Sequence, residues 1–186
     1  DIGAGTTDIC RVQGYFPTAE DQVSVDFAGD TVDSLLAAAV KRNYPDVALS
    51  TSRLRQIKEQ HSYVGTSDVP VSVNEVVAGK MRRLELGEAV GTACQQLLLK
   101  VFDCVQQMIA RCSTETVAEL LQNIILTGGG SRIRNIDSEL QRLLVEDGYE
   151  KPRVQTVGEN YKEHVAKGAL AAARQAEERE WINLVG

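Results

Sequence analysis

The sequence predicts a mixed α/β fold into which a small α+β unit is inserted. Three features predict it: two early β-prone segments, one long amphipathic helix in the middle of the chain, and an apolar strand that runs into three glycines. The 186 residues are 43% hydrophobic and 25% charged, which is typical of a folded globular chain with an ordinary core.

The first half of the chain predicts a hairpin followed by the inserted unit. Alternating apolar and polar residues at 23–27 indicate a half-buried strand that pairs with the segment before it. Asp30 or Thr31 is expected to cap the helix that follows, and the run from Asn43 to Asp46 to stop it. The expected elements are β-prone 1–12, strand 23–27, helix 32–42, a short helix after 50–52, and strands 69–77 and 80–86 joined by the two-residue turn Ala78-Gly79.

The second half predicts a long helix followed by helices and strands in alternation. Val90, Leu97, Val101 and Met108 recur at helical spacing, so this helix is expected to be a major part of the core. The strand at 123–127 is apolar over Ile124, Ile125 and Leu126 and is expected to be fully buried. The expected elements are helix 88–111, a short helix at 115–121, strand 123–127, helix 136–146, strand 153–157 and a final helix at 162–181.

The charge and composition argue against several kinds of partner. The formal net charge of -6 gives no general attraction to nucleic acid or anionic lipid. The longest apolar stretches are far shorter than the about 20 residues that a membrane span needs. Four cysteines without a C-x-x-C pair, and two histidines, predict neither a disulfide framework nor a Cys/His metal cluster. We therefore expect a cytoplasmic chain without nucleic acid or membrane insertion.

The first glycine segment, residues 1–8, has the chemistry of a phosphate grip. Glycine lets the backbone approach an anion closely, and its exposed N–H groups together with Thr6 and Thr7 can donate hydrogen bonds to phosphate. Asp1 and Asp8 could hold the water shell of Mg²⁺. The alternative is a simple hairpin turn in which Gly3 and Gly5 serve backbone freedom alone.

The second glycine segment, Gly128 to Gly130, lies between the apolar strand and a helix. Ligands of α/β proteins sit at this place, outside the carboxyl ends of strands, and three glycines suggest close approach of a ligand to the backbone. The alternative is a flexible connection between strand and helix.

The two segments together resemble nucleotide motifs of the actin, Hsp70 and sugar-kinase superfamily. Residues 1–8 resemble its second phosphate-binding loop, and residues 125–131 its adenosine motif, in the family order. The amino-acid sequence of these segments is most similar to that of the MamK family of bacterial actins, which line up magnetosome organelles. The MreB family is similar but more distant. The stretches that carry this similarity are Asp1 to Cys10 (DIGAGTTDIC), Glu20 to Gln22 (EDQ), Lys58 to Gly65 (KEQHSYVG) and Leu121 to Arg134 (LQNIILTGGGSRIR).

The resemblance implies a fold and a division into parts. The fold would be the second lobe of an actin-like ATPase, which is ribonuclease H-like, with a small α+β subdomain inserted. Residues 1–27 and 88–186 would form the nucleotide-binding subdomain, and residues 28–87 the inserted subdomain.

The resemblance also implies roles for individual residues. Asp1 would hold Mg²⁺ through water, and Asp8 would lie near the attacking water, although it could also only cap the turn. Lys58 and Glu59 would reach the ribose or adenine; the alternative is a solvated pair on a helix. The residues implied around the nucleotide are Gly3, Ala4, Gly5, Thr6, Thr7, Gly29, Lys58, Glu59, Gly128, Gly129 and Gly130.

The function that the resemblance implies is that of a cytoskeletal ATPase. It would bind ATP and Mg²⁺, polymerise head to tail, and position magnetosomes together with magnetosome-associated proteins along the chain of organelles. Because the sequence opens at Asp1 rather than Met, we expect a fragment without the first lobe, and expect ATP hydrolysis from the longer protein but not from the fragment. The alternatives are an MreB-like cell-shape filament, a small-molecule kinase, or an Hsp70-like ATPase.

Overall fold

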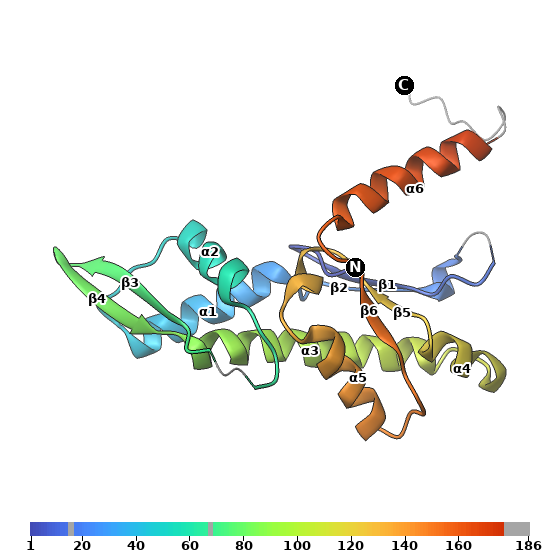
Figure 1. Cartoon of the computed structure of the whole chain (residues 1–186), viewed down its shortest axis with the longest axis horizontal. Helices are drawn as coiled ribbons and strands as arrows, with labels where there is room; N and C mark the ends of the chain where they lie inside the picture. The colour runs from blue at the N-terminus through green and yellow to red at the C-terminus, as the bar shows by residue number, and fades with distance from the viewer. Residues whose placement is uncertain (15–16, 67–68, 177–186) are drawn as a thin grey trace.

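A long central helix organises the computed structural model, which describes residues 1–14, 17–66 and 69–176 (Figure 1). The strands of the described residues pair into three two-stranded sheets. In the first half the elements are β1 (Thr7–Cys10), the 3₁₀ turn η1 (Ala19–Asp21), β2 (Gln22–Val25), α1 (Gly29–Asn43), α2 (Thr51–His61), β3 (Ser72–Val77) and β4 (Lys80–Glu85). In the second half they are α3 (Gly87–Ile109), α4 (Thr114–Leu121), β5 (Ile124–Leu126), η2 (Gly129–Arg132), α5 (Ile136–Glu146), β6 (Val154–Thr156) and α6 (Tyr161–Gln175).

Helix α3 forms the centre of the core and runs along the long axis of the molecule (Figure 1). Its apolar residues recur every three or four positions, as predicted, and Leu97, Leu98 and Val101 are at most 2% exposed. Helices α1 and α5 both pack against it. Val32 and Leu36 of α1 belong to the same apolar cluster, so the core is continuous across the predicted boundary between the two subdomains. The division into residues 28–87 and the rest of the chain is not visible as a break in the core, and it stays a prediction.

Replacing Leu98 by alanine is expected to destabilise the fold strongly. Leu98 is 0% exposed in the middle of α3, and truncating a buried leucine leaves a cavity that its neighbours cannot fill, at a cost of about 2–5 kcal/mol. The neighbouring Leu99 is 45% exposed and provides the control, because Leu99→Ala removes little buried surface. Urea unfolding of both variants measures the difference, and equal losses would contradict the central place of α3.

Two of the sheets are linked through the beginning of the chain. Strands β1 and β2 pair antiparallel, which confirms the predicted hairpin, and β5 pairs parallel with β6. Between them, the Ile2 N–H donates to the Thr127 carbonyl at 2.9 Å, while Ile2 also forms a bridge with Thr7. Ile2 is 1% exposed, so it packs into the core as well as joining the two sheets.

The hairpin of β3 and β4 projects from one end of the molecule (Figure 1). The two-residue turn predicted at Ala78-Gly79 is confirmed, since Val77 pairs with Lys80 directly across it. Ala78 and Gly79 have φ angles of 49° and 78°, which is the left-handed pair that a tight turn between twisted strands requires.

Three expectations about single elements are wrong or reach beyond the described residues. Helix α1 begins at Gly29, so neither Asp30 nor Thr31 caps it; the loop carbonyls of Gly3 and Ala4 accept from its first N–H groups instead. Strand β5 is not fully buried, because side chains alternate along a strand and Ile125 is 62% exposed on the outer face. Helix α6 ends at Gln175, and residues 177–181 of its predicted range lie outside the described residues.

Helix α6 points away from the rest of the molecule (Figure 1), and none of its residues is buried. Its apolar side chains Val165 and Leu170 are 68% and 52% exposed. Among the described residues, no helix is both long enough and apolar enough to cross a membrane.

The Asp21 carboxylate joins the ends of the first hairpin and should make its stability depend on pH. The Thr18 N–H and hydroxyl donate to it at 2.9 and 2.8 Å, and Arg11 Nε donates at 2.7 Å. These hydrogen bonds, those of Thr18 first, lower the pKa of Asp21 to about 2. Since the pKa of an aspartate in an unfolded chain is about 3.9, the stabilisation should be complete above that pH and be lost as the pH falls toward 2.

The measurement compares the wild type with Asp21→Asn in urea unfolding at pH 7 and at pH 3. The difference in stability is expected to shrink at the lower pH. The control is Asp46→Asn, which removes an exposed pair with Arg82 and should change stability little at either pH. A difference for Asp21→Asn that stays constant with pH would contradict this assignment.

Candidate functional site

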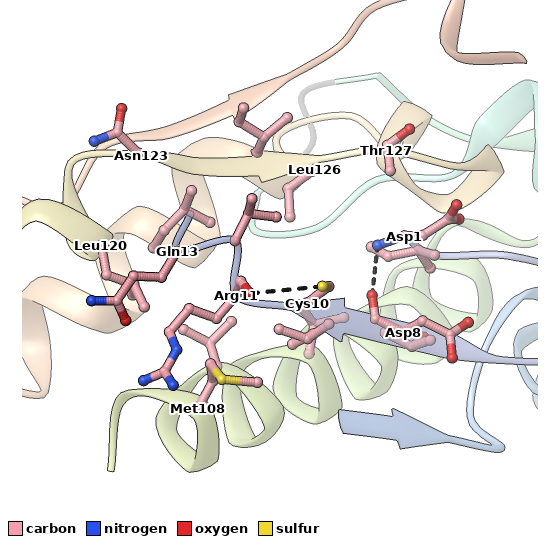
Figure 2. Close-up of a pocket in the computed structure, with 18 of the residues that line it drawn as sticks. Asp1, Asp8, Cys10, Arg11, Gln13, Met108, Leu120, Asn123, Leu126 and Thr127 are labelled. Carbon is pink, nitrogen blue, oxygen red and sulfur yellow. Dashed lines mark hydrogen bonds between the residues drawn. The ribbon is translucent and has the colours of Figure 1, made fainter. Parts of the chain in front are cut away.

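Two cavities flank the first residues of the chain. The larger, of about 850 Å³, lies between β1 and β5 and is lined mainly by apolar side chains such as Met108, Leu120 and Leu126 (Figure 2). The smaller, of about 730 Å³, lies on the other side of Asp1 and contains residues of both glycine segments. Because most of the predicted nucleotide residues line the smaller cavity, we assign the candidate site to it.

The first glycine segment presents backbone donors to this region. The Gly3 N–H donates to the Thr6 carbonyl at 2.9 Å and closes a tight turn. In the described part of the chain, the N–H groups of Ala4, Gly5 and Thr6 donate to no backbone carbonyl. Successive free N–H groups in a turn are the donors that cradle an anion, so this turn can bind phosphate oxygens.

The residues that follow the turn are occupied by contacts inside the protein. Thr7 is 1% exposed, and its hydroxyl donates to the Phe27 carbonyl at 2.7 Å. The Asp8 carboxylate accepts from the hydroxyls of Ser24 at 2.5 Å and Thr6 at 2.7 Å. These two hydrogen bonds, that of Ser24 first, hold the pKa of Asp8 below its usual range, so the group is ionised at neutral pH.

The first turn of α1 forms a second wall of the cavity. The Gly29 N–H donates to the Gly3 carbonyl at 3.1 Å, and the Asp30 N–H donates to the Ala4 carbonyl at 2.8 Å. A Cβ atom on Gly29 would lie 3.2 Å from both the Gly3 carbonyl oxygen and Lys58 Nζ. The backbone therefore approaches the loop so closely here that only glycine fits without movement of its neighbours.

Helix α2 supplies charged side chains to the same cavity. It begins at the predicted Ser/Thr cluster, where the Ser50 hydroxyl accepts from the Arg53 N–H at 3.2 Å. One turn of helix separates Arg55 from Lys58, so both lie on the face toward the cavity, and Glu59 lines it too. Lys58 Nζ donates to the Gly29 carbonyl at 2.8 Å.

The second glycine segment forms the third wall of the cavity. Its three glycines differ in how closely other residues approach them. A Cβ atom on Gly128 would lie 2.3 Å from Asp1 Oδ1 and 2.5 Å from the Ile2 carbonyl oxygen, and one on Gly130 would lie 2.2 Å from Ile2 Cγ2. On Gly129 the nearest atom would be the Tyr161 hydroxyl at 3.7 Å. Gly128 and Gly130 are therefore required by the close approach of the protein's own residues Asp1 and Ile2, whereas a side chain at Gly129 would meet only an ordinary contact.

The structure brings most of the predicted site residues together, but not all of them. Those that line the smaller cavity are Asp1, Gly3, Ala4, Gly29, Lys58, Glu59, Gly128, Gly129 and Gly130. Gly5, Thr6, Thr7 and Asp8 are not among its lining residues. Their predicted roles at the nucleotide stay predictions, and for the side chains of Thr7 and Asp8 the contacts seen here are internal ones.

Several lining residues were missed by the sequence reasoning. They include Arg55, Arg132, Tyr161 and Lys162. The position of Arg55, one helical turn before Lys58, could have been found from helical spacing. Arg132 closely follows the second glycine segment and could have been found from its place in the motif. No local pattern marks Tyr161 and Lys162, because they reach the cavity from a segment that is distant in sequence.

The acidic residues differ in how well they fit Mg²⁺. The exposed Asp1 lines both cavities and lies against Gly128. An exposed carboxylate with room for water suits Mg²⁺, which keeps several of its waters. Both carboxylate oxygens of Asp8 already accept a hydroxyl, and Asp8 lines only the larger cavity. Of the two, Asp1 therefore fits the metal better.

Solved structures with the same arrangement identify the class of protein. The chain matches a MamK double helical filament with a TM-score of 0.88 at 34% identity, over 95% of this chain and 54% of that one. A non-polymerising MamK mutant bound to AMPPNP matches with a TM-score of 0.84 at 34% identity, over 93% of this chain and 52% of that one. The fold is that of the actin-like proteins, as predicted.

Within that class, the chain belongs to the MreB/Mbl protein family, whose model matches residues 1–180. The actin-like protein MamK of Paramagnetospirillum magneticum strain AMB-1 is 38% identical over 144 residues, which are 77% of this chain and 42% of that protein. The cell shape-determining protein MreB of Escherichia coli K12 is 27% identical over 153 residues, 79% of this chain and 42% of that protein. The predicted resemblance is confirmed, with MamK more similar than this MreB, and the chain matches only about half of the length of these relatives.

Proposed function

We propose that the chain is the nucleotide-holding part of an actin-like filament protein, and that it binds ATP with Mg²⁺ in the cavity of about 730 Å³. The observation that carries this proposal is the meeting of both glycine segments and the first turn of α1 around one cavity. Free N–H groups lie at the Gly3 turn, and cationic and acidic side chains lie on α2. Phosphate would bind at the turn, and the nucleoside between Gly129 and α2.

In this arrangement Asp1 would hold Mg²⁺ through its waters, and the metal would neutralise charge on the phosphates. The open backbone at Gly129 gives the flat base room against the chain, while Lys58 and Glu59 offer a donor and an acceptor to the ribose or base. Hydrolysis belongs to the longer protein in this proposal, because positioning groups on both sides of a triphosphate are needed for the rate.

The MamK similarity supports a filament that positions magnetosomes, with other copies of itself and magnetosome-associated proteins as partners in the cytoplasm. The relatives carry the name MamK, and one of the matching structures is a MamK double helical filament. A head-to-tail interface that does not close into a ring produces a filament. The more distant MreB similarity leaves a cell-shape filament as the competing outcome.

Nucleotide binding by the chain is tested by titration calorimetry with ATP and Mg²⁺. Gly29→Val is expected to weaken binding at least about tenfold, because its side chain would occupy space beside Lys58 Nζ and the Gly3 carbonyl. The control is Gly168→Ala on α6, where a Cβ atom meets nothing within 4 Å. Equal affinities for both variants would place the nucleotide elsewhere.

Filament formation is tested on the longer protein that contains this chain, by sedimentation and negative-stain microscopy with and without ATP and Mg²⁺. Nucleotide-dependent filaments support the proposal. A soluble monomer that phosphorylates a small molecule would instead support a kinase of the same fold.

A further inference from the structure

The acidic residue Asp33 of α1 is buried beside the candidate site without being part of its wall. Its side chain is 7% exposed, and the charged groups that face it come from α2: Lys58 Nζ lies 2.9 Å from Oδ1, and Arg55 Nε lies 3.5 Å from Oδ2. The angles at Oδ1 do not fit a hydrogen bond, so this oxygen is held by the ion pair alone. A buried carboxylate is costly unless a cation offsets its charge, so the pair with Lys58 needs an explanation.

The same ammonium group connects Asp33 to the phosphate turn. Lys58 Nζ donates to the Gly29 carbonyl at 2.8 Å, and the Gly29 N–H donates to the Gly3 carbonyl at 3.1 Å. A continuous path of polar contacts therefore runs from Asp33 through Lys58 and Gly29 to the turn that offers free N–H groups. Each member of this path except Asp33 lines the cavity.

The number of free N–H donors on Lys58, and the offset of its charge by Asp33, determine how it can bind a ligand. An ammonium group has three N–H donors, and in the described part of the chain the contacts of this one are with Asp33 and the Gly29 carbonyl. At least one donor therefore remains for the cavity. Because Asp33 offsets the positive charge, Lys58 acts there as a hydrogen-bond donor more than as a counter-ion for phosphate.

We propose that Asp33 is a positioning residue of the nucleoside half of this site: it holds the Lys58 ammonium against the first turn of α1, in reach of the ribose or base. Lysine has a flexible stem, so without the carboxylate the ammonium would leave this position for water. The inference rests on the proposed nucleotide binding, and it goes beyond it by separating Lys58 from the phosphates.

The test measures the affinity of the 186-residue chain for ATP and for AMP by calorimetry, both with Mg²⁺. Asp33→Asn is expected to weaken both by the same factor, about tenfold, because the two nucleotides share the nucleoside that Lys58 contacts. Asp33→Glu keeps the charge and is expected to stay within about threefold of the wild type. The control is Glu75→Gln on β3. It removes the ion-pair partner of Arg53, a residue of α2 that does not line the cavity, and should leave both affinities unchanged.

Each outcome decides between the proposals. If the wild type does not bind ATP, the proposed function fails for this chain, and the inference fails with it. If the wild type binds but Asp33→Asn has unchanged affinities, or loses clearly more for ATP than for AMP, the inference alone is overturned, because a greater loss for ATP means that the phosphate half is disturbed. Circular dichroism establishes folding first. Where Asp33→Asn is unfolded, the double variant Asp33→Leu with Lys58→Met replaces it, because it removes the pair without leaving a buried charge. It is expected to lose affinity for ATP and AMP by the same factor, and unchanged affinities or a clearly greater loss for ATP overturn the inference.

Discussion

Alanine at Gly128 or at Gly130 is expected to destabilise the chain by about 3 kcal/mol or more, while alanine at the glycine between them is tolerated. Gly128 has φ 83° and ψ 177°, a backbone conformation that is nearly restricted to glycine. Its Cβ atom would also meet the Ile2 carbonyl oxygen at 2.5 Å, and a Cβ atom on Gly130 would meet Ile2 Cγ2 at 2.2 Å. Ile2 cannot move aside, because its N–H is bonded to Thr127 and its side chain is buried.

Gly129→Ala is the matched control for these two variants. Its nearest contact would be the Tyr161 hydroxyl at 3.7 Å, an ordinary van der Waals distance, and its φ angle is not positive. Urea unfolding monitored by circular dichroism compares the three variants. We expect Gly129→Ala to change the free energy of unfolding by less than about 0.5 kcal/mol. Three equal losses would show that the segment is constrained by something other than its contact with Ile2.

Removing the Lys58 ammonium is expected to have the second large effect, about 3 kcal/mol in Lys58→Met. Methionine keeps much of the length of the side chain, but it leaves the Asp33 carboxylate, which is 7% exposed, with the more distant Arg55 as its remaining cation among the residues that the structure describes. An uncompensated buried charge costs far more than the net value of the pair that it replaced. The double variant Lys58→Met with Asp33→Leu should therefore recover most of the lost stability.

The control for this prediction is a pair with the same separation on the surface. Lys167 Nζ and Glu163 also lie 2.9 Å apart, but their side chains are 69% and 57% exposed on α6. Lys167→Met should change the free energy of unfolding by less than about 0.5 kcal/mol. If the two lysine variants lose the same amount, burial is not what makes the pair with Asp33 important.

The sequence alone predicted most of the helices and strands, because periodicity and turn chemistry are local. Helix α5 has the predicted bounds, 136–146, and the turn at Ala78-Gly79 and the apolar stripe of α3 are confirmed. The glycine motifs indicated the superfamily, since phosphate and nucleoside constrain a short run of residues in a recognisable way. The start of α1 was missed because the first N–H groups of the helix find their acceptors in the loop at Gly3, which is distant along the chain.

What the sequence by itself determined is therefore the order of elements, the family and the segments that surround the candidate site. Only the tertiary structure decided which residue in each segment is free to act. Gly128 and Gly130 make room for Ile2, the Thr7 hydroxyl bonds to Phe27, and Lys58 is paired with Asp33, which no local pattern marked. Each of these contacts joins residues that are far apart in sequence, and such contacts form only when the packed core brings their elements together.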